Sequence, residues 1–176
     1  MRILLFILFL LYTFPSFSSY GISLFEKGEY KKAYSAISKE LLNNNKDYAL
    51  LNMMGACCYN LGKTREAEKY YLLSLKNKPD YIYALANLAI LYLENNEYSS
   101  LNIICHKLIK YFPERFYGYL GRAYYLYKKK KYDEAYSQVK IAGEKMYNND
   151  KLLNKEENRY FYMLYLDLKK KIIASK

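Results

Sequence analysis

The 176-residue chain has few of the residues on which enzyme chemistry usually depends. Its one histidine, His106, has no partner at catalytic spacing, because the adjacent Cys105 would point about 100° away on a helix. The three cysteines form no Cys-x-x-Cys pair, so a zinc or redox site has no support. Glycine-rich phosphate loops and catalytic carboxylate pairs are also missing from the sequence. We therefore expect no catalytic residue, no cofactor and no metal site, and the protein is not expected to be an enzyme.

What the sequence does contain is a pattern that recurs four times with a period of 34 residues. Small residues recur at two positions of this period, at Gly21, Gly55, Ala89 and Ala123, and at Ala33, Ala67 and Ala135, with Leu101 at the same position in the third copy. Proline recurs once at the same interval, at Pro79 and Pro113. A fixed period of this length is typical of helical solenoids, which are more often binding surfaces than enzymes.

The second copy, residues 48–81, shows the physical cause of the period. Its first apolar stripe has the i, i+3, i+4, i+7 spacing of a helix and consists of Leu51, Met54, Gly55 and Cys58. Gly62 is suited to the left-handed backbone conformation that ends a helix. A second apolar stripe starts at Ala67. Pro79 blocks continuation of the second helix. Each copy is therefore predicted to be two antiparallel helices, which approach closely where Gly55 and Ala67 lie.

These features resemble tetratricopeptide repeats, whose 34-residue unit is a helix-turn-helix with small facing residues and a proline near its end. The resemblance covers four units, at about residues 14–47, 48–81, 82–115 and 116–149. It implies an all-α, right-handed α-solenoid. The chain departs from the family in having no tryptophan, in carrying Leu101 at a small position, and in lacking the terminal proline at Asn45 and Tyr147.

Residues 1–18 do not fit the repeat and have the layout of a secretory signal peptide. A basic start is followed by the apolar run Ile3 to Tyr12, a break at Pro15, and small residues that a signal peptidase reads. We expect cleavage after Ser18 and an exported protein, periplasmic or secreted. The alternative is a membrane anchor through residues 3–17, although this stretch is shorter than the roughly 20 residues that span a bilayer.

Residues 150–176 are expected to cap the last repeat. A helix is predicted from Lys155 to Ile173, with an apolar stripe at Tyr160, Met163, Leu164, Leu168 and Ile172. A solenoid needs such an element to cover the exposed face of its last unit. The alternative is a helix that binds a partner or a second copy, and the sequence leaves the oligomeric state open.

The chain is basic, with 28 Lys and Arg against 17 Asp and Glu and a net charge of +11. Export argues against a nucleic-acid partner. The densest run, Lys128 to Lys131, is expected to be a solvated turn, and the alternative is peripheral contact with an anionic membrane surface. The cysteine count is odd, so at least one thiol is free, and we expect Cys57, Cys58 and Cys105 to be small core residues.

In the family, the first helices of successive repeats line a concave groove that holds a peptide or protein segment. The resemblance implies a partner-binding groove formed by Phe25, Asn52, Tyr59, Tyr83, Asn87, Ile90, Tyr117, Tyr124 and Tyr127, with Ile22, Ala56, Leu93 and Leu120 at its other positions. Tyrosines are favoured at binding hot spots, and the two asparagine amides could hold a peptide backbone. The chain has 24 tyrosines, so the alternative is that some of them pack between repeats.

Some family members hold a C-terminal carboxylate with fixed Lys, Asn and Arg residues, of which this chain matches only Asn87, so this clamp is not expected. The sequence thus predicts an exported adaptor that binds a protein or peptide partner in a tyrosine-rich groove. The alternative is a membrane-tethered or charge-held envelope component that acts through its basic surface.

Overall fold

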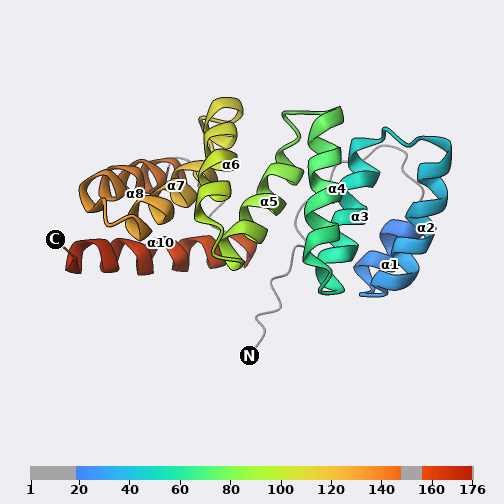
Figure 1. The fold of residues 1–176 in the computed structure, drawn as a ribbon. Coiled ribbons are helices and arrows are strands. Elements are labelled where there is room, and N and C mark those ends of the chain that lie inside the picture. The colour runs from blue at the N-terminus through green and yellow to red at the C-terminus, as the bar shows by residue number, and fades with distance from the viewer. Residues whose placement is uncertain (1–18, 148–155, 176) are drawn as a thin grey trace. The chain divides into compact units, whose positions relative to one another are not determined.

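The computed structural model describes residues 19–147 and 156–175, and all regular elements in these ranges are α-helices (Figure 1). In chain order they are α1 (Ser19–Glu26), α2 (Tyr30–Asn43), α3 (Tyr48–Asn60), α4 (Thr64–Asn77), α5 (Ile82–Glu94), α6 (Tyr98–Tyr111), α7 (Tyr117–Lys128), α8 (Tyr132–Tyr147) and α10 (Glu156–Ala174). The predicted all-α fold of repeated helix-turn-helix units with a C-terminal helix is confirmed.

The chain divides into two compact units, and the boundary falls inside α5, between Asn87 and Leu88. In unit 1, α1 packs on α2, α2 on α3 and α3 on α4. In unit 2, α6 packs on α7, α7 on α8, and α10 on both α7 and α8. Within each unit, these helices pack on their neighbours in the chain, as expected of short connections between antiparallel helices.

The turn inside each repeat has the same backbone in all four copies. Gly28, Gly62, Asn96 and Lys130 have positive φ angles of 76°, 76°, 61° and 60°, and they are spaced by the repeat period. This left-handed residue ends the first helix of each hairpin. The prediction for Gly62 is confirmed, and the same conformation is adopted by an asparagine and a lysine in the later copies.

Proline decides where the second helix of a repeat ends. Helices α4 and α6 stop two residues before Pro79 and Pro113, as expected from the missing N–H and the restraint on the preceding residue. The fourth copy has no proline there, and α8 continues through Tyr147. At the start of α3, the Asp47 side chain accepts hydrogen bonds of 2.9 Å from two backbone N–H groups.

The core of unit 1 adds one detail to the packing expected from the sequence. A methyl group at Gly55 would lie 2.5 Å from Cε1 of Tyr71, whose ring is fully buried. The small residue on α3 therefore receives a large ring from α4. The sequence predicts a close approach of the two helices at Gly55 and Ala67; Ala67 is fully buried, and the Tyr71 ring fills the space beside Gly55.

The C-terminal helix α10 covers the end of unit 2, as predicted. Leu168 and Ile172 are buried in one apolar cluster with residues of α7 and α8, such as Leu126 and Val139. The predicted stripe was wrong at Met163, which is 58% exposed. The side chains of Tyr160 and Leu164, also assigned to this stripe, lie outside the described part of the structure.

The three cysteines are unpaired and buried, which confirms them as core residues. Burial raises the pKa of Cys57 and Cys105 to about 12 and that of Cys58 to about 11. These thiols are therefore protonated at neutral pH and are poor nucleophiles.

The predicted signal peptide, residues 1–18, lies outside the described residues. Among the helices within the described ranges, none has the length and apolar character needed to cross a bilayer.

Candidate functional site

In unit 1, the structure joins the two asparagines assigned to the groove. The Asn87 Nδ2 on α5 donates a hydrogen bond of 3.0 Å to the Asn52 Oδ1 on α3. Asn87 is buried and Asn52 is half-buried. The pair links the first helices of the second and third copies, and the hydrogen bond uses the Asn87 Nδ2 and the Asn52 Oδ1 of the two amides that were predicted to hold a peptide backbone.

Tyr83 in unit 1 lies at the edge of an aromatic cluster. Its ring meets that of Tyr81 edge-on, at 5.1 Å between centroids, and Tyr81 meets Tyr48 in the same way at 4.8 Å. The Lys78 ammonium lies 4.7 Å from the centroid of the Tyr48 ring, within cation–π range. Burial is the main reason why the pKa of Tyr81 is raised. Tyr83 therefore rests on a fixed aromatic base while its own side chain stays half-buried.

In unit 2, Tyr124 belongs to a cluster of two tyrosines and a lysine. Its ring is 5.9 Å from that of Tyr98, and the Lys128 ammonium lies 5.4 Å from the Tyr124 centroid and 5.3 Å from the Tyr98 centroid. A side-chain hydrogen bond with Tyr98 is the main reason why the pKa of Lys128 is raised. The cation is thus held between two aromatic faces, at the C-terminal end of α7.

The other two predicted tyrosines of unit 2 are also half-buried and packed against a second ring. Tyr117 lies 4.1 Å from Phe116, and Tyr127 lies 6.0 Å from Tyr132 on α8. Lys171 of α10 binds Asp167 through its ammonium at 2.6 Å, and this hydrogen bond is the main reason why the pKa of Lys171 is raised. Helix α10 also packs on α7.

Other positions assigned to the groove contribute to the core. Phe25 is only 8% exposed and packs edge-on against Tyr30, with centroids 5.2 Å apart. Ala56 and Leu120 are buried in the apolar clusters of their units. Half-buried side chains at the remaining positions are those of Ile22, Tyr59, Ile90 and Leu93. Five of the half-buried residues on the predicted surface are therefore tyrosines, namely Tyr59, Tyr83, Tyr117, Tyr124 and Tyr127.

Lys128 was predicted to belong to a solvated turn, whereas the structure places its ammonium against the rings of Tyr98 and Tyr124. Lys131 in the same run forms an ion pair of 2.9 Å with Glu134, and Lys129 and Lys130 are exposed. The sequence did contain an indication of such aromatic contacts. Tyr30, Tyr98 and Tyr132 occupy the same position of the 34-residue repeat, at the start of the second helix. A tyrosine at this position is close to the first helix of a hairpin.

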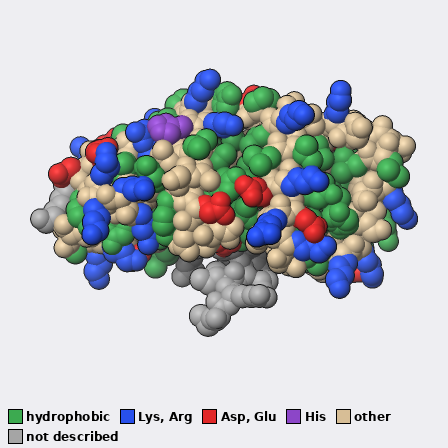
Figure 2. Space-filling view, in the orientation of Figure 1, with side chains coloured by type: hydrophobic (Ala, Val, Ile, Leu, Met, Phe, Trp, Pro, Cys, Tyr) green, Lys and Arg blue, Asp and Glu red, His purple; other side chains and the backbone are tan. Residues whose placement is uncertain are grey.

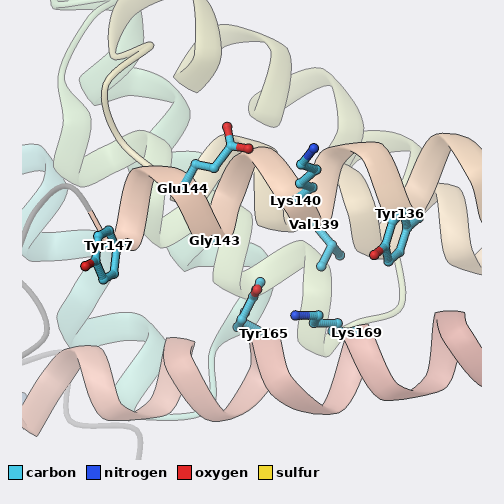
Figure 3. Close-up of a pocket in the computed structure, with 8 residues that line it drawn as sticks. All are labelled: Tyr136, Val139, Lys140, Gly143, Glu144, Tyr147, Tyr165 and Lys169. Atoms are coloured by element: carbon cyan, nitrogen blue, oxygen red, sulfur yellow. The ribbon is translucent and has the colours of Figure 1, made fainter.

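A pocket of about 350 Å³ lies between α8 and α10 in unit 2 (Figure 3). Its lining residues are Tyr136, Val139, Lys140, Gly143, Glu144, Tyr147, Tyr165 and Lys169. A methyl group at Gly143 would lie 2.6 Å from the Tyr165 hydroxyl, so this glycine leaves room for the α10 tyrosine. None of the nine predicted groove residues lines this pocket.

Charge is spread over the surface. On the face drawn in Figure 2, Lys and Arg side chains are scattered between hydrophobic and uncharged surface, with fewer acidic groups among them. In the part of the chain that the structure describes, no three His, Cys, Asp or Glu side chains gather in a way that could hold a metal ion.

Comparison with known proteins supports the repeat assignment. The family model for the tetratricopeptide repeat matches residues 113–137, which include α7, the turn and the start of α8. No curated protein sequence matches the chain. The match is local, and together with the fold it supports a tetratricopeptide-repeat protein.

Three solved structures with a similar fold are distant from this chain in sequence. MamA from Desulfovibrio magneticus is 14% identical with a TM-score of 0.67, over 89% of this chain and 86% of that one. A tetratricopeptide repeat protein from Parabacteroides merdae is 19% identical with a TM-score of 0.65, over 88% and 59%. The first such domain of Spaghetti (RPAP3), bound to the HSP90 peptide SRMEEVD, is 17% identical with a TM-score of 0.59, over 73% and 92%. These likenesses establish the fold as that of tetratricopeptide-repeat proteins.

Proposed function

We propose that this chain is an exported, non-enzymatic adaptor that binds a peptide or protein segment through the tyrosines on the first helices of its repeats. The observation that carries the proposal is the state of Tyr83, Tyr117, Tyr124 and Tyr127. Each is half-buried, and each ring is packed against a second aromatic ring.

Rings held in this way are suited to binding because little freedom is lost when a ligand meets them. Association is opposed by the ordering of side chains, at about 0.5–1.5 kcal/mol for each mobile one. Tyrosine also combines a large apolar face with a hydroxyl that can bond a peptide group. The cluster of unit 2 adds the Lys128 ammonium, which favours a segment with an acidic or carbonyl group beside its apolar residues.

The RPAP3 domain supports a peptide ligand by analogy, because it has the same fold and was solved with a bound HSP90 peptide. The mode of binding is expected to differ. The set of groove residues that fixes a C-terminal carboxylate in some of these proteins is matched here by Asn87 alone, and that amide is buried and bonded to Asn52.

The proposal can be tested with a displayed library of random peptides, selected on the chain and followed by calorimetry of the enriched sequence. Replacing Tyr124 with Ala should weaken binding about 30-fold, the equivalent of a hot spot of about 2 kcal/mol. Matched controls are Tyr20→Ala and Tyr147→Ala, which remove tyrosines that are 64% and 76% exposed. Equal losses in the controls would contradict a role for the packed tyrosines.

Export is proposed from the sequence of residues 1–18 and has a separate test. The protein isolated from its native cells should begin at Ser19 and be released without detergent. An intact Met1 on material that stays in washed membranes would favour the membrane-tethered alternative.

A further inference from the structure

Among the side chains of the cap helix α10 that the structure describes, an apolar stripe lies on the outer face, where a terminal helix is normally polar. Met163, Leu166 and Ile173 are 58%, 39% and 53% exposed. Their spacing of three and seven residues places them along one side of the helix. Leu168 and Ile172, on the other side, are buried against α7 and α8. Since a capping element usually presents a polar outer face, this stripe needs an explanation.

Two lysines border the stripe. A shallow apolar hollow on α10 is lined by Leu166, Lys169, Lys170, Ile173 and Ala174. The aliphatic stems of the lysines extend the apolar surface. Lys170 is exposed, whereas Lys169 is half-buried, with its ammonium 5.7 Å from the centroid of the Tyr165 ring at the edge of the pocket between α8 and α10. Lys171 binds Asp167 through its ammonium. The face therefore joins apolar side chains to cations, as in helices that lie in a membrane interface.

We propose that this face of α10 docks on an anionic membrane surface. Met163, Leu166 and Ile173 enter the boundary between headgroups and acyl chains, and Lys169 and Lys170 meet acidic headgroups. The net charge of +11 favours the same approach through long-range attraction. This docking is separate from peptide binding by the packed tyrosines, because it uses no residue of that surface.

A second copy of the chain fits this face less well. In a symmetric pair centred on the stripe, Lys169 and Lys170 lie near the middle and would meet the same lysines of the other copy. The apolar contact is also small, because three partly exposed side chains fall far short of the roughly 800 Å² that each partner contributes to a stable interface. An anionic lipid surface supplies the opposite charge and requires no groove.

The absence of tryptophan allows a local test on the full chain. In Ile173→Trp, the emission should shift to the blue and be quenched by brominated lipid when vesicles containing about 30% phosphatidylglycerol are added, and not with pure phosphatidylcholine. The matched control is Ile103→Trp on α6, since Ile103 is exposed to a similar extent, 59%. Binding of vesicles by residues 1–18 is common to both variants and does not move either probe into lipid.

The charge requirement is tested in the Ile173→Trp background. Lys169→Gln with Lys170→Gln should lower the apparent affinity for the anionic vesicles at least tenfold, because each lysine near an anionic surface contributes about 1 kcal/mol. Lys129→Gln with Lys130→Asn, in the turn between α7 and α8, should change the affinity less than threefold. Equal losses in the two pairs, or no probe response on α10, would overturn the proposal. A blue shift that depends on protein concentration without vesicles would assign the face to self-association and overturn it as well.

Discussion

Units 1 and 2 build the same hairpin with different residues at equivalent positions. In unit 1 the small position of the first helix is glycine, and its counterpart 16 residues later is large, in the pairs Gly21 with Ile37 and Gly55 with Tyr71. In unit 2 the corresponding pairs are alanine with a smaller residue, Ala89 with Cys105 and Ala123 with Val139. The smaller residue on the first helix is thus accompanied by the larger residue on the second helix.

Unit 2 uses its helical glycines for a different contact. A methyl group at Gly118 on α7 would lie 2.8 Å from Cγ1 of Ile109 on α6, and one at Gly121 would overlap the Cys105 sulfur. Glycine therefore admits a side chain within the hairpin in unit 1 and brings consecutive hairpins together in unit 2. The comparison teaches that a recurring small residue marks a close contact, but not which neighbour makes it.

The largest expected effect comes from filling the glycine of unit 1. Gly55→Ala should destabilise the protein by about 2 kcal/mol, because overpacking a rigid core costs about 1–3 kcal/mol or more and exceeds the roughly 1 kcal/mol gained in helix propensity. The Tyr71 ring cannot move aside, since it is fully buried. Urea denaturation followed by circular dichroism measures the change.

The internal comparison supplies a control for this variant. Gly55→Ala combined with Tyr71→Val copies the pair Ala123 and Val139 of unit 2. If size complementarity is the cause, the double variant should be more stable than the sum of the two single changes predicts. Additive losses would show that Gly55 is required for another reason.

Gly121→Ala in unit 2 is expected to cost less, about 1 kcal/mol, because a thiol can rotate away from the new methyl group more easily than a packed ring. Cys105→Ala should restore part of the loss in the double variant. Thermal unfolding of the wild type, the two single variants and the double variant measures the coupling free energy between Gly121 and Cys105. A loss as large as that of Gly55→Ala would mean that α6 and α7 must also separate.

The shared turn gives a smaller, purely backbone comparison. A methyl group at Gly62 would meet no atom within 4 Å, so Gly62→Ala tests the left-handed conformation alone and should cost about 1 kcal/mol. The reverse change in unit 2, Lys130→Gly, should stabilise by about 0.5 kcal/mol, because lysine adopts a φ of 60° at a steric cost. Both changes are measurable by urea titration, and a stabilising Gly62→Ala would contradict the assignment.

The fold could be predicted from the sequence because the 34-residue period fixes helix length and turn position together. Gly62 was readable as a left-handed residue, whereas Asn96 and Lys130 were not, since their residue types do not require that conformation. The contact of Gly55 with Tyr71 was missed because spacing along one helix does not specify the facing side chain on the next.

The candidate site was less predictable than the fold. Phe25 and Tyr124 occupy groove positions of the repeat, yet one is a core residue and the other remains accessible. Rotation of a helix by a fraction of a turn decides between these outcomes, and the hydrophobic pattern does not resolve it. The position of Lys128 between two rings depends on a tyrosine from α6, which only the tertiary structure reveals.

The smallest expected change in stability comes from removing the Tyr71 hydroxyl while keeping its ring. Among the described residues none bonds this hydroxyl, although it is buried, and burial raises the pKa of Tyr71 well above its usual value. Tyr71→Phe keeps the ring that fills the space at Gly55 and removes an unsatisfied polar group, so it should be neutral or stabilise by up to about 1 kcal/mol. Urea denaturation beside Tyr71→Val makes the distinction: a loss in both variants would show that the hydroxyl has a partner, such as a buried water, and that unit 1 depends on it.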